Sequence, residues 1–195
     1  MKILCLGDSN TYGYDPRSVL EDSYAAPWPA LLEEMLNRKG EVHHTVINLG
    51  MNGRELPSSD LQMQWIDLQI RRELPADLLI LLLGTNDLIN TAWQPEELVK
   101  QRLSRFLPHL RTIFPALPIL LLVPMPFNEL GTWPTCSVYP PEIPAIYKAA
   151  GTRYDCTVAD CSQWNLPLTF DGVHLTEEGH RLFASLCLKE IQSML

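Results

Sequence analysis

Short apolar runs recur along the chain, and each one is followed within a few residues by a turn or a polar segment. The run at 77–83 has no alternation of polar and apolar residues, which is typical of a strand buried on both faces of a parallel sheet. Runs of this length are too short for helices and fit strands bounded by turns. The predicted strands are 3–6, 45–49, 77–83, 119–123 and 156–159, the last being the weakest.

Apolar residues at helical spacing separate these strands. The first predicted helix begins near Pro29 and ends at Gly40. In the next one, which stops at Pro75, the spacing of Leu61, Trp65 and Leu68 predicts the buried face.

Three further helices follow. One begins at Pro95, carries an apolar stripe from Leu98 to Ile113, and is expected to kink or end at Pro108. A short helix is expected at 146–150 and a final helix at 176–194.

Strand and helix therefore alternate about five times. Short right-handed crossovers between such units produce a parallel sheet with helices on both faces. We predict an α/β fold of three layers, α/β/α, with a flavodoxin-like five-stranded parallel sheet. A length of 195 residues suits one domain, so residues 1–195 are predicted to form a single domain.

The segment 124–144 is the one irregular region, because it contains six prolines. So many prolines forbid a regular helix, and we expect an ordered loop over one end of the sheet. Phe127, Leu130, Trp133 and Tyr139 lie in or beside this loop and could make a substrate pocket bulky and shallow.

Composition and charge narrow the class of protein. A formal net charge of −8 argues against a nucleic-acid partner, which would favour clustered Lys and Arg. No secretory signal is visible before Gly7, and the longest apolar run is far too short to span a bilayer. The odd cysteine count without a C-x-x-C pair predicts free thiols and a cytoplasmic location. The cysteines are Cys5, Cys136, Cys156, Cys161 and Cys187.

Four polar segments follow predicted strands. They are Ser9 with its neighbours, Gly50 to Gly53, residues 84–87 and residues 171–174. In a parallel sheet the carboxyl ends of the strands lie at one edge, where ligands bind in open α/β folds. These segments are therefore expected to meet along one rim.

The residue types on this rim suit acyl transfer. A serine such as Ser9 needs a base to accept its proton, and His174 can serve, with Asp171 fixing the imidazole tautomer. The oxyanion of a tetrahedral intermediate needs donors, which the backbone N–H groups of Ser9 and Gly53 and the Asn86 amide could supply. Taken singly each motif is weak, and the Gly-Asp-Ser turn could equally be a helix cap.

Together the four segments resemble the SGNH hydrolases, also called GDSL esterases and lipases. The resemblance rests on Gly-Asp-Ser-Asn-Thr at 7–11, Gly-x-x-Gly at 50–53, Gly-Thr-Asn-Asp at 84–87 and Asp-Gly-Val-His at 171–174. It is nearest to small intracellular arylesterase and acyltransferase members.

This resemblance implies roles for individual residues. Ser9 is the expected nucleophile, His174 the base with Asp171 behind it, and Gly53 and Asn86 the oxyanion donors. Gly53 is preferred to Gly50 because the family's donor closes this turn. Asn10 stands where the family name implies leucine, and we expect it to tune the pocket.

The predicted function is a cofactor-free serine esterase that hydrolyses or transfers short acyl groups of small-molecule esters. Alternatives on the same scaffold are a carbohydrate O-deacetylase and a lysophospholipase or thioesterase. A non-enzymatic alternative is an anion-binding α/β module, which would not require Asp171 and His174.

No cluster of residues has metal-ligand spacing, so no metal is expected. A phosphoesterase that holds a metal through Asp8, Asp87 and Asp171 is a weaker alternative. The sequence leaves open a homo-oligomer and the choice between water and an alcohol as acyl acceptor.

Overall fold

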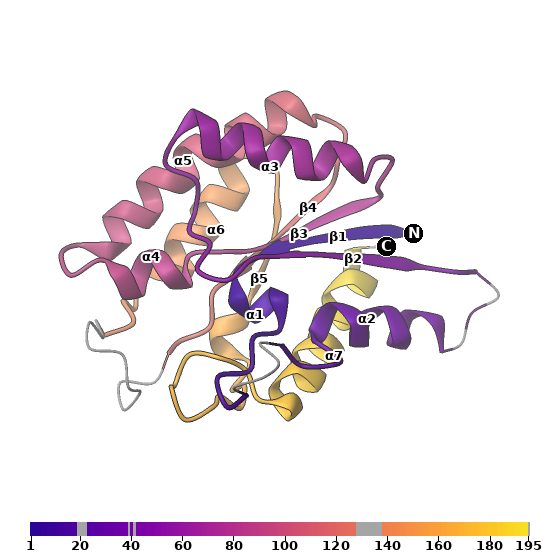
Figure 1. The fold of residues 1–195 in the computed structure, drawn as a ribbon. Coiled ribbons are helices and arrows are strands. Elements are labelled where there is room, and N and C mark those ends of the chain that lie inside the picture. Colours follow the sequence, from indigo (N-terminus) through magenta and orange to yellow (C-terminus); the bar gives the residue numbers. More distant parts are fainter. Residues whose placement is uncertain (19–22, 39, 41, 128–137, 195) are drawn as a thin grey trace.

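In the computed structural model, five parallel strands form one sheet in the order β2-β1-β3-β4-β5 (Figure 1). This is the strand order of flavodoxin-like folds, so the predicted fold class is confirmed. The structure describes residues 1–18, 23–38, 40, 42–127 and 138–194. The strands are β1 (Lys2–Gly7), β2 (Thr45–Gly50), β3 (Leu78–Leu82), β4 (Ile119–Val123) and β5 (Thr157–Asp160).

Helices follow the strands and cover both faces of the sheet (Figure 1). The longer helices are α2 (Trp28–Asn37), α3 (Asp60–Arg72), α5 (Pro95–Ile113), α6 (Ile143–Arg153) and α7 (Glu177–Met194). Three short helical segments are α1 (Ser9–Tyr12), α4 (Thr85–Asn90) and the 3-10 turn η1 (Cys161–Gln163). The two short α-helices begin directly at the polar segments after β1 and β3, and the sequence pattern did not predict them.

Alternate residues of each central strand pack into two separate hydrophobic cores, one on each face of the sheet. In β1, Leu4 and Leu6 face the core shared with α3, α5 and α6, whereas Ile3 and Cys5 face the core shared with α2 and α7. All four side chains are fully buried. Burial on both faces explains why the strand sequences are continuous apolar runs.

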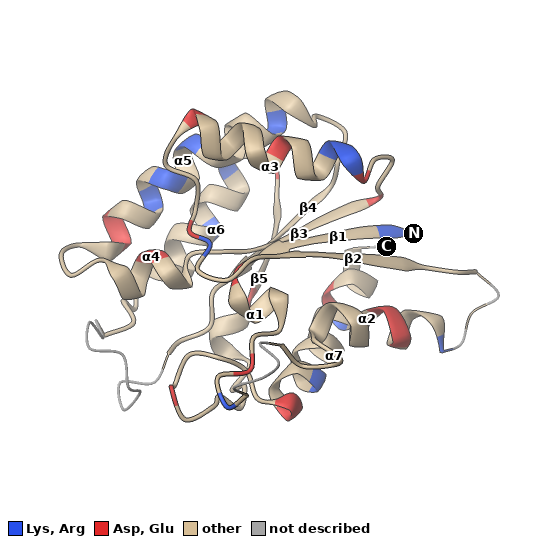
Figure 2. Ribbon diagram, in the orientation of Figure 1, with Lys and Arg blue, Asp and Glu red and all other residues tan. Residues whose placement is uncertain are grey.

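Charged residues lie mainly on the helices and loops rather than on the strands (Figure 2). In α5 the acidic residues Glu96 and Glu97 lie in the first turn, and all the charged residues that follow are basic. Among the described residues, no helix combines the length and the apolar character needed to cross a membrane. The four cysteines within the described part of the chain are free thiols, and Cys136 lies outside it.

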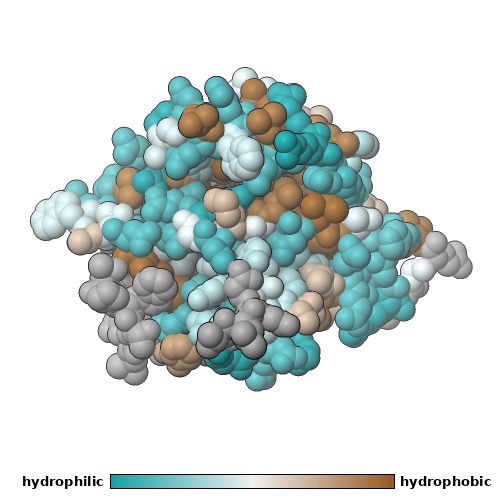
Figure 3. All heavy atoms as spheres, in the orientation of Figure 1, coloured by the Kyte–Doolittle hydropathy of each residue, from teal (hydrophilic) through white to brown (hydrophobic). Residues whose placement is uncertain are grey.

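The predicted buried face of α3 is wrong. Leu61, Trp65 and Leu68 have exposed fractions of 76%, 51% and 49%, while Met63 and Ile66 are buried. Apolar side chains are visible on the surface over this helix (Figure 3). Both stripes of α3 are apolar and both have helical spacing, so the periodicity alone does not decide which one faces the sheet.

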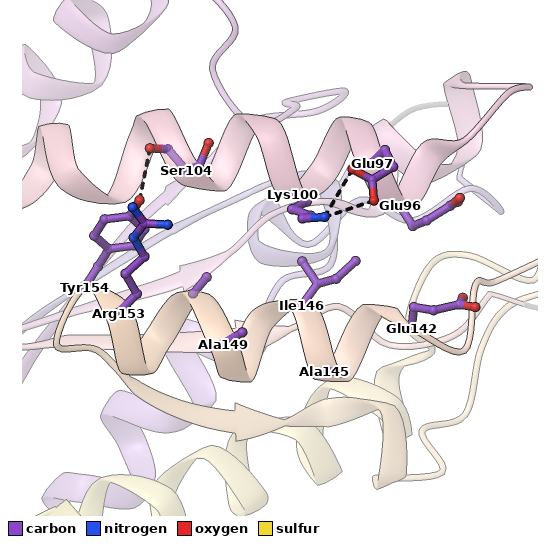
Figure 4. A pocket seen from close by; sticks show the side chains of 11 residues that line it. Glu96, Glu97, Lys100, Ser104, Glu142, Ala145, Ile146, Ala149, Arg153 and Tyr154 are labelled. Atoms are coloured by element: carbon purple, nitrogen blue, oxygen red, sulfur yellow. Dashed lines mark hydrogen bonds and ion pairs between the residues drawn. The ribbon is translucent and has the colours of Figure 1, made fainter.

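Helix α5 continues through Pro108 to Ile113, so of the two expected outcomes, a kink or an end at this proline, the end is wrong. Proline lacks the N–H that would bond to the carbonyl four residues earlier, here that of Ser104. The hydroxyl of Tyr154, just beyond the end of α6, donates to this carbonyl oxygen at 3.4 Å (Figure 4). The neighbouring helix thus supplies a substitute for the missing donor.

Candidate active site

The turn from β1 into α1 presents Ser9 at the carboxyl end of a central strand. Asp8 is the N-cap of α1, and its Oδ1 accepts the backbone N–H of Asn10 at 2.9 Å. Residue 7 must be glycine, because a Cβ there would lie 1.9 Å from Thr11 Oγ1. Strand, glycine and cap together fix the position of Ser9, whose own N–H lies in the first turn of the helix.

A tight loop between η1 and α7 is organised by the carboxylate of Asp171. Its Oδ1 accepts the hydroxyl of Thr169 at 2.7 Å and the backbone N–H groups of Val173 and His174 at 2.9 and 3.0 Å. Gly172 permits the turn by adopting a φ of +71°. Thr169 was not identified from the sequence, since a threonine two residues before an aspartate has no distinctive pattern.

Ser9, His174 and Asp171 form one continuous hydrogen-bonded chain. His174 Nε2 lies 2.9 Å from Ser9 Oγ, and His174 Nδ1 lies 2.6 Å from Asp171 Oδ2. All three residues are buried, with Ser9 7% exposed. The ring of Tyr14 packs edge-on against that of His174, with centroids 4.8 Å apart.

The environment of Asp171 keeps it ionised. Burial alone would raise its pKa, but the hydrogen bonds from His174, Val173 and Thr169 outweigh burial and hold the pKa well below its ordinary value. An ionised Asp171 accepts a hydrogen bond from the protonated Nδ1 of His174. The unprotonated Nε2 is then free to accept the Ser9 proton. The chain can therefore move a proton from the serine hydroxyl to the imidazole.

The two glycines after β2 are in different environments. The N–H of Gly50 donates to Asn48 Oδ1 at 2.8 Å, and a Cβ on Gly50 would lie 2.1 Å from the Tyr12 nitrogen. Gly53 is exposed, has a φ of +71°, and a Cβ added to it would contact nothing within 4 Å. Gly50 is thus a packing position, whereas Gly53 faces open space.

Asn86 is joined to the segment that follows Gly53. Its Nδ2 donates to the backbone carbonyl of Arg54 at 3.0 Å. An amide carries two hydrogens, so this bond fixes the plane of the side chain and leaves a second hydrogen for another acceptor. Asn86 is the second residue of α4, directly after the carboxyl end of β3.

A partly buried ion-pair network braces the same region. Asp87 accepts the backbone N–H of Leu56 at 3.0 Å and Arg102 Nη1 at 2.6 Å, and this nitrogen also donates to Glu55 at 2.6 Å. Burial raises the pKa of Asp87 to about 6, although the Leu56 N–H and Arg102 oppose the shift. Glu55 and Arg102 were not identified from the sequence, because their partners lie on other elements.

Asn10 is buried, with 1% of its surface exposed. Its side-chain amide bonds to the backbone around His174, and the expectation that it tunes the pocket stays a prediction. Among the described residues, no group of three or more His, Cys, Asp or Glu side chains is placed to hold a metal ion. Asp8, Asp87 and Asp171 each bond to a different part of the site.

Two surface hollows lie near these elements. One, of about 470 Å³, is lined by the Gly53 and Arg54 segment and by Met51, Leu61 and Trp65, so it borders the candidate site. The other, of about 430 Å³, lies between α5 and α6, with Ile146 and Ala149 facing Glu97 and Lys100 (Figure 4). The second hollow contains none of the rim residues.

The proline-rich segment is described only in part. Phe127 is buried in the core, and Tyr139 packs edge-on against it while donating its hydroxyl to the Pro124 carbonyl at 2.8 Å. Leu130 and Trp133 lie outside the described residues. The described part is therefore anchored to the core, and α6 begins at Ile143, before the predicted end of the loop.

The chain is similar to known proteins in sequence over most of its length and in fold over all of it. The GDSL-like Lipase/Acylhydrolase family matches residues 5–182. No curated protein matches the sequence significantly.

Among solved structures, a carbohydrate acetylesterase family member from Sinorhizobium meliloti is 24% identical, with a TM-score of 0.76 and coverage of 100% of this chain and 98% of that one. The aryl esterase of M. smegmatis is 22% identical, with a TM-score of 0.72 and coverage of 100% and 99%. A lipase/acylhydrolase from Enterococcus faecalis is 21% identical, with a TM-score of 0.71 and coverage of 100% and 96%.

Proposed function

The chain belongs to the GDSL-like lipase/acylhydrolase (SGNH) family of carboxylic-ester hydrolases, and from this premise we propose that it is a serine esterase acting on small esters of short acids. The observation that carries the proposal is the hydrogen-bonded chain from Ser9 through His174 to Asp171. An anion-binding module would need the Ser9 turn and helix end, but it would not need a base aimed at the serine hydroxyl.

In the proposed acylation step, Ser9 Oγ attacks the ester carbonyl carbon while His174 Nε2 accepts the serine proton. Asp171 stabilises the resulting imidazolium and keeps the proton on Nδ1. The carbonyl oxygen becomes an oxyanion, for which the N–H groups of Ser9 and Gly53 and the second Asn86 hydrogen are the proposed donors.

The tetrahedral intermediate then collapses. The bond from carbon to the leaving oxygen breaks, and His174 gives its proton to the departing alcohol. This leaves Ser9 as an acyl ester. Water, or another alcohol in the case of acyl transfer, repeats the sequence in reverse and regenerates the serine.

The choice of Gly53 over Gly50 as the backbone donor is supported by local contacts. The Gly50 N–H is already bonded to Asn48, whereas Gly53 lies in open space beside the segment that Asn86 touches. Asp87, Arg102 and Glu55 would keep this segment and Asn86 in register.

Removal of acetyl groups from carbohydrates is a second candidate. The fold of this chain is similar to that of a carbohydrate acetylesterase family member from Sinorhizobium meliloti, which motivates this candidate. At 24% identity the similarity supports a common fold and not a common substrate. Both candidates use the same residues and differ in the alcohol that departs, which is an aryl or simple alkyl alcohol in one case and a sugar hydroxyl in the other.

A labelling experiment tests the proposal. A fluorophosphonate probe should react at Ser9, as located by mass spectrometry of the labelled peptide, and Ser9→Ala should abolish both labelling and ester hydrolysis. Ser193→Ala, which removes a serine near the end of α7 whose hydroxyl donates to the Glu190 carbonyl, should change neither. Labelling elsewhere with hydrolysis intact in Ser9→Ala would remove Ser9 from the mechanism.

Rates on acetylated sugars and on aryl acetates then separate the two candidates. A higher kcat/KM for aryl acetates favours the general esterase, and a higher value for acetylated sugars favours the deacetylase. The Ser9→Ala variant is the blank for both substrate sets.

A further inference from the structure

The side chain of Asn10 bonds to the backbone on both sides of His174. Its Oδ1 accepts the backbone N–H of Leu175 at 2.9 Å, and its Nδ2 donates to the carbonyl of Val173 at 3.1 Å. The amide therefore pairs with residues 173–175 much as a neighbouring strand would. It does so from the residue next to Ser9, 165 positions away in the sequence from Leu175.

The same segment is fixed on its other side. The N–H of Thr169 donates to the His174 carbonyl at 2.7 Å, and Leu168 forms an antiparallel bridge with Leu175. Residues 173–175 thus lie between the 168–169 backbone and the Asn10 amide. Of these two supports, Asn10 is the one that belongs to the helix carrying Ser9.

Asn10 is itself held in place at its base. Its backbone N–H donates to Asp8 Oδ1 at 2.9 Å, within the cap of α1. Its side chain is 1% exposed, so water does not compete for the two amide bonds. The side-chain amide therefore links the cap of the Ser9 helix to the backbone at His174 through short, buried contacts.

We propose that Asn10 is a positioning residue that sets the contact between Ser9 Oγ and His174 Nε2 by clamping residues 173–175 to α1. This inference rests on the proposed function, since it assigns Asn10 to the transfer of the Ser9 proton. The 2.9 Å contact needs the two side chains, which come from different segments, to be held in register. A misplacement of about 1 Å at a reacting group can cost on the order of a hundredfold in rate.

Leucine is the informative replacement. It has the same branching and number of side-chain heavy atoms as asparagine, but it can neither donate nor accept. In Asn10→Leu the Leu175 N–H and the Val173 carbonyl lose their partners inside the protein, which also costs stability. A control must therefore separate lost stability from lost positioning.

Asn37 provides that control, because it makes an equivalent clamp far from the site. Its Nδ2 donates to the His44 carbonyl at 2.9 Å and its Oδ1 accepts the His44 N–H at 2.8 Å. The residue is partly buried, and its Nδ2 also donates to the Glu33 carbonyl at 2.9 Å. Asn10→Leu and Asn37→Leu each remove a side-chain amide that bonds to a backbone N–H and a backbone carbonyl of another segment. Only the first lies next to Ser9.

The experiment measures kcat, KM, the rate constant of fluorophosphonate labelling and the melting temperature for both variants. We expect Asn10→Leu to lower kcat by about tenfold or more, to lower the labelling rate by a similar factor, and to change KM by less than about twofold. Asn37→Leu should lower the melting temperature but keep kcat within about twofold of the wild type.

Three results would overturn the clamp. They are a folded Asn10→Leu variant with wild-type kcat, a loss confined to KM, and an equal loss of kcat in Asn37→Leu. If Asn10→Leu does not fold, Asn10→Asp takes its place. This variant keeps an acceptor for the Leu175 N–H and removes the donor to Val173. Wild-type kcat in Asn10→Asp would also overturn the clamp. The Ser9→Ala variant separates the two proposals. Activity in Ser9→Ala contradicts the esterase mechanism. An inactive Ser9→Ala variant together with a fully active Asn10→Leu variant contradicts the clamp alone.

Discussion

The carboxylate of Asp171 holds His174 in two places, because Oδ1 accepts its backbone N–H at 3.0 Å and Oδ2 lies 2.6 Å from its ring Nδ1. One side chain thus sets both the position of the residue and the orientation of its imidazole. The Nε2 edge of that imidazole faces Ser9 Oγ. The effects of substituting these residues follow from this arrangement.

His174→Ala should lose nearly all turnover, as Ser9→Ala should, because the proton acceptor is removed while the fold remains. Asp171→Ala should lose somewhat less turnover. The imidazole can still accept a proton in this variant, but its tautomer and orientation are less well controlled. Members of such a unit act together, so the losses will not add in double variants. The measurement is kcat/KM on an aryl acetate, with circular dichroism as the folding control, and wild-type turnover in Asp171→Ala would contradict the assignment.

Asn86→Ala removes one proposed oxyanion donor and should lower kcat by on the order of a hundredfold or more. The interaction is needed most when the oxygen becomes negatively charged, so KM should change little. Asn37→Ala is a suitable control, because it removes a side-chain amide that bonds to His44 and Glu33, away from the rim. An Asn86→Ala variant altered only in KM would show that Asn86 binds ground-state substrate.

Alanine at the two glycines after β2 should have unequal effects on stability. At Gly50 the new Cβ would lie 2.1 Å from the Tyr12 nitrogen and 2.5 Å from its Cα, so Gly50→Ala should disrupt the packing of α1 on β2. At Gly53 the space is open, and only the positive φ costs energy, about 1–2 kcal/mol. Thermal denaturation should therefore show a much larger loss for Gly50→Ala, and equal losses would contradict this account.

Asp8 should make stability depend on pH in the mildly acidic range. Burial raises its pKa in the folded protein to about 6 from 3.8, while the Asn10 N–H and the neighbouring His174 oppose the shift. The folded state therefore binds more protons than the unfolded state between these values, so this group lowers the stability as the pH rises from about 4 to about 6. Each pKa unit corresponds to about 1.4 kcal/mol, so the free energy of unfolding should fall by about 1–3 kcal/mol across this range.

Asp8→Asn should remove this dependence while keeping a side-chain oxygen to cap α1. The difference in free energy of unfolding between the variant and the wild type, measured by urea denaturation from pH 4 to 7, should grow in favour of the variant. A difference that stays constant with pH would show that Asp8 does not titrate in this range. The comparison variant is Asp15→Asn. Asp15 is partly buried, and its pairing with Arg17 lowers its pKa instead of raising it.

Short acyl chains should be preferred. The described part of the proline-rich segment is anchored, with Phe127 in the core and Tyr139 bonded to the Pro124 carbonyl. The preference rests on the expectation that this segment borders the acyl pocket, where an anchored backbone would yield little to a long chain, although each buried methylene could contribute about 0.8 kcal/mol if it found an apolar slot. Values of kcat/KM on p-nitrophenyl esters should peak at acetyl to butyryl, whereas a continuous rise through dodecanoyl would favour the lysophospholipase or thioesterase alternative.

The sequence predicts β1, β3 and β4 well because burial on both faces leaves a simple apolar signal, whereas the edge strands β2 and β5 are partly exposed. All five apolar runs are strands, and their ends agree with the structure to within a residue or two. The rim follows from the same reasoning, since parallel strands bring Ser9 and residues 171–174 to one edge. The hydrogen bonds of His174 agree with the pairing expected from the sequence, while its catalytic role remains a proposal.

The short helices and the outer face of α3 could not be predicted in this way. Helix α1 has four residues and is fixed by the Asp8 cap and by contacts with β2, not by an apolar stripe. In α3, Leu61 and Trp65 compete with Met63 and Ile66 for the buried face, and only the position of the sheet decides between them. The role of Asn10 likewise depends on a partner segment at the other end of the sequence.

The distance along the chain between Ser9 and His174 also has a consequence for biosynthesis. A ribosome makes the serine turn first, and residues 171–175 only after all five strands. A nascent chain folded through β5 would display Ser9 without its base and Asn10 without its backbone partners. Under the proposed mechanism, Ser9 in such a chain would have no base until the last loop before α7 docks, so the serine would gain its proton acceptor only after the sheet beneath it is complete.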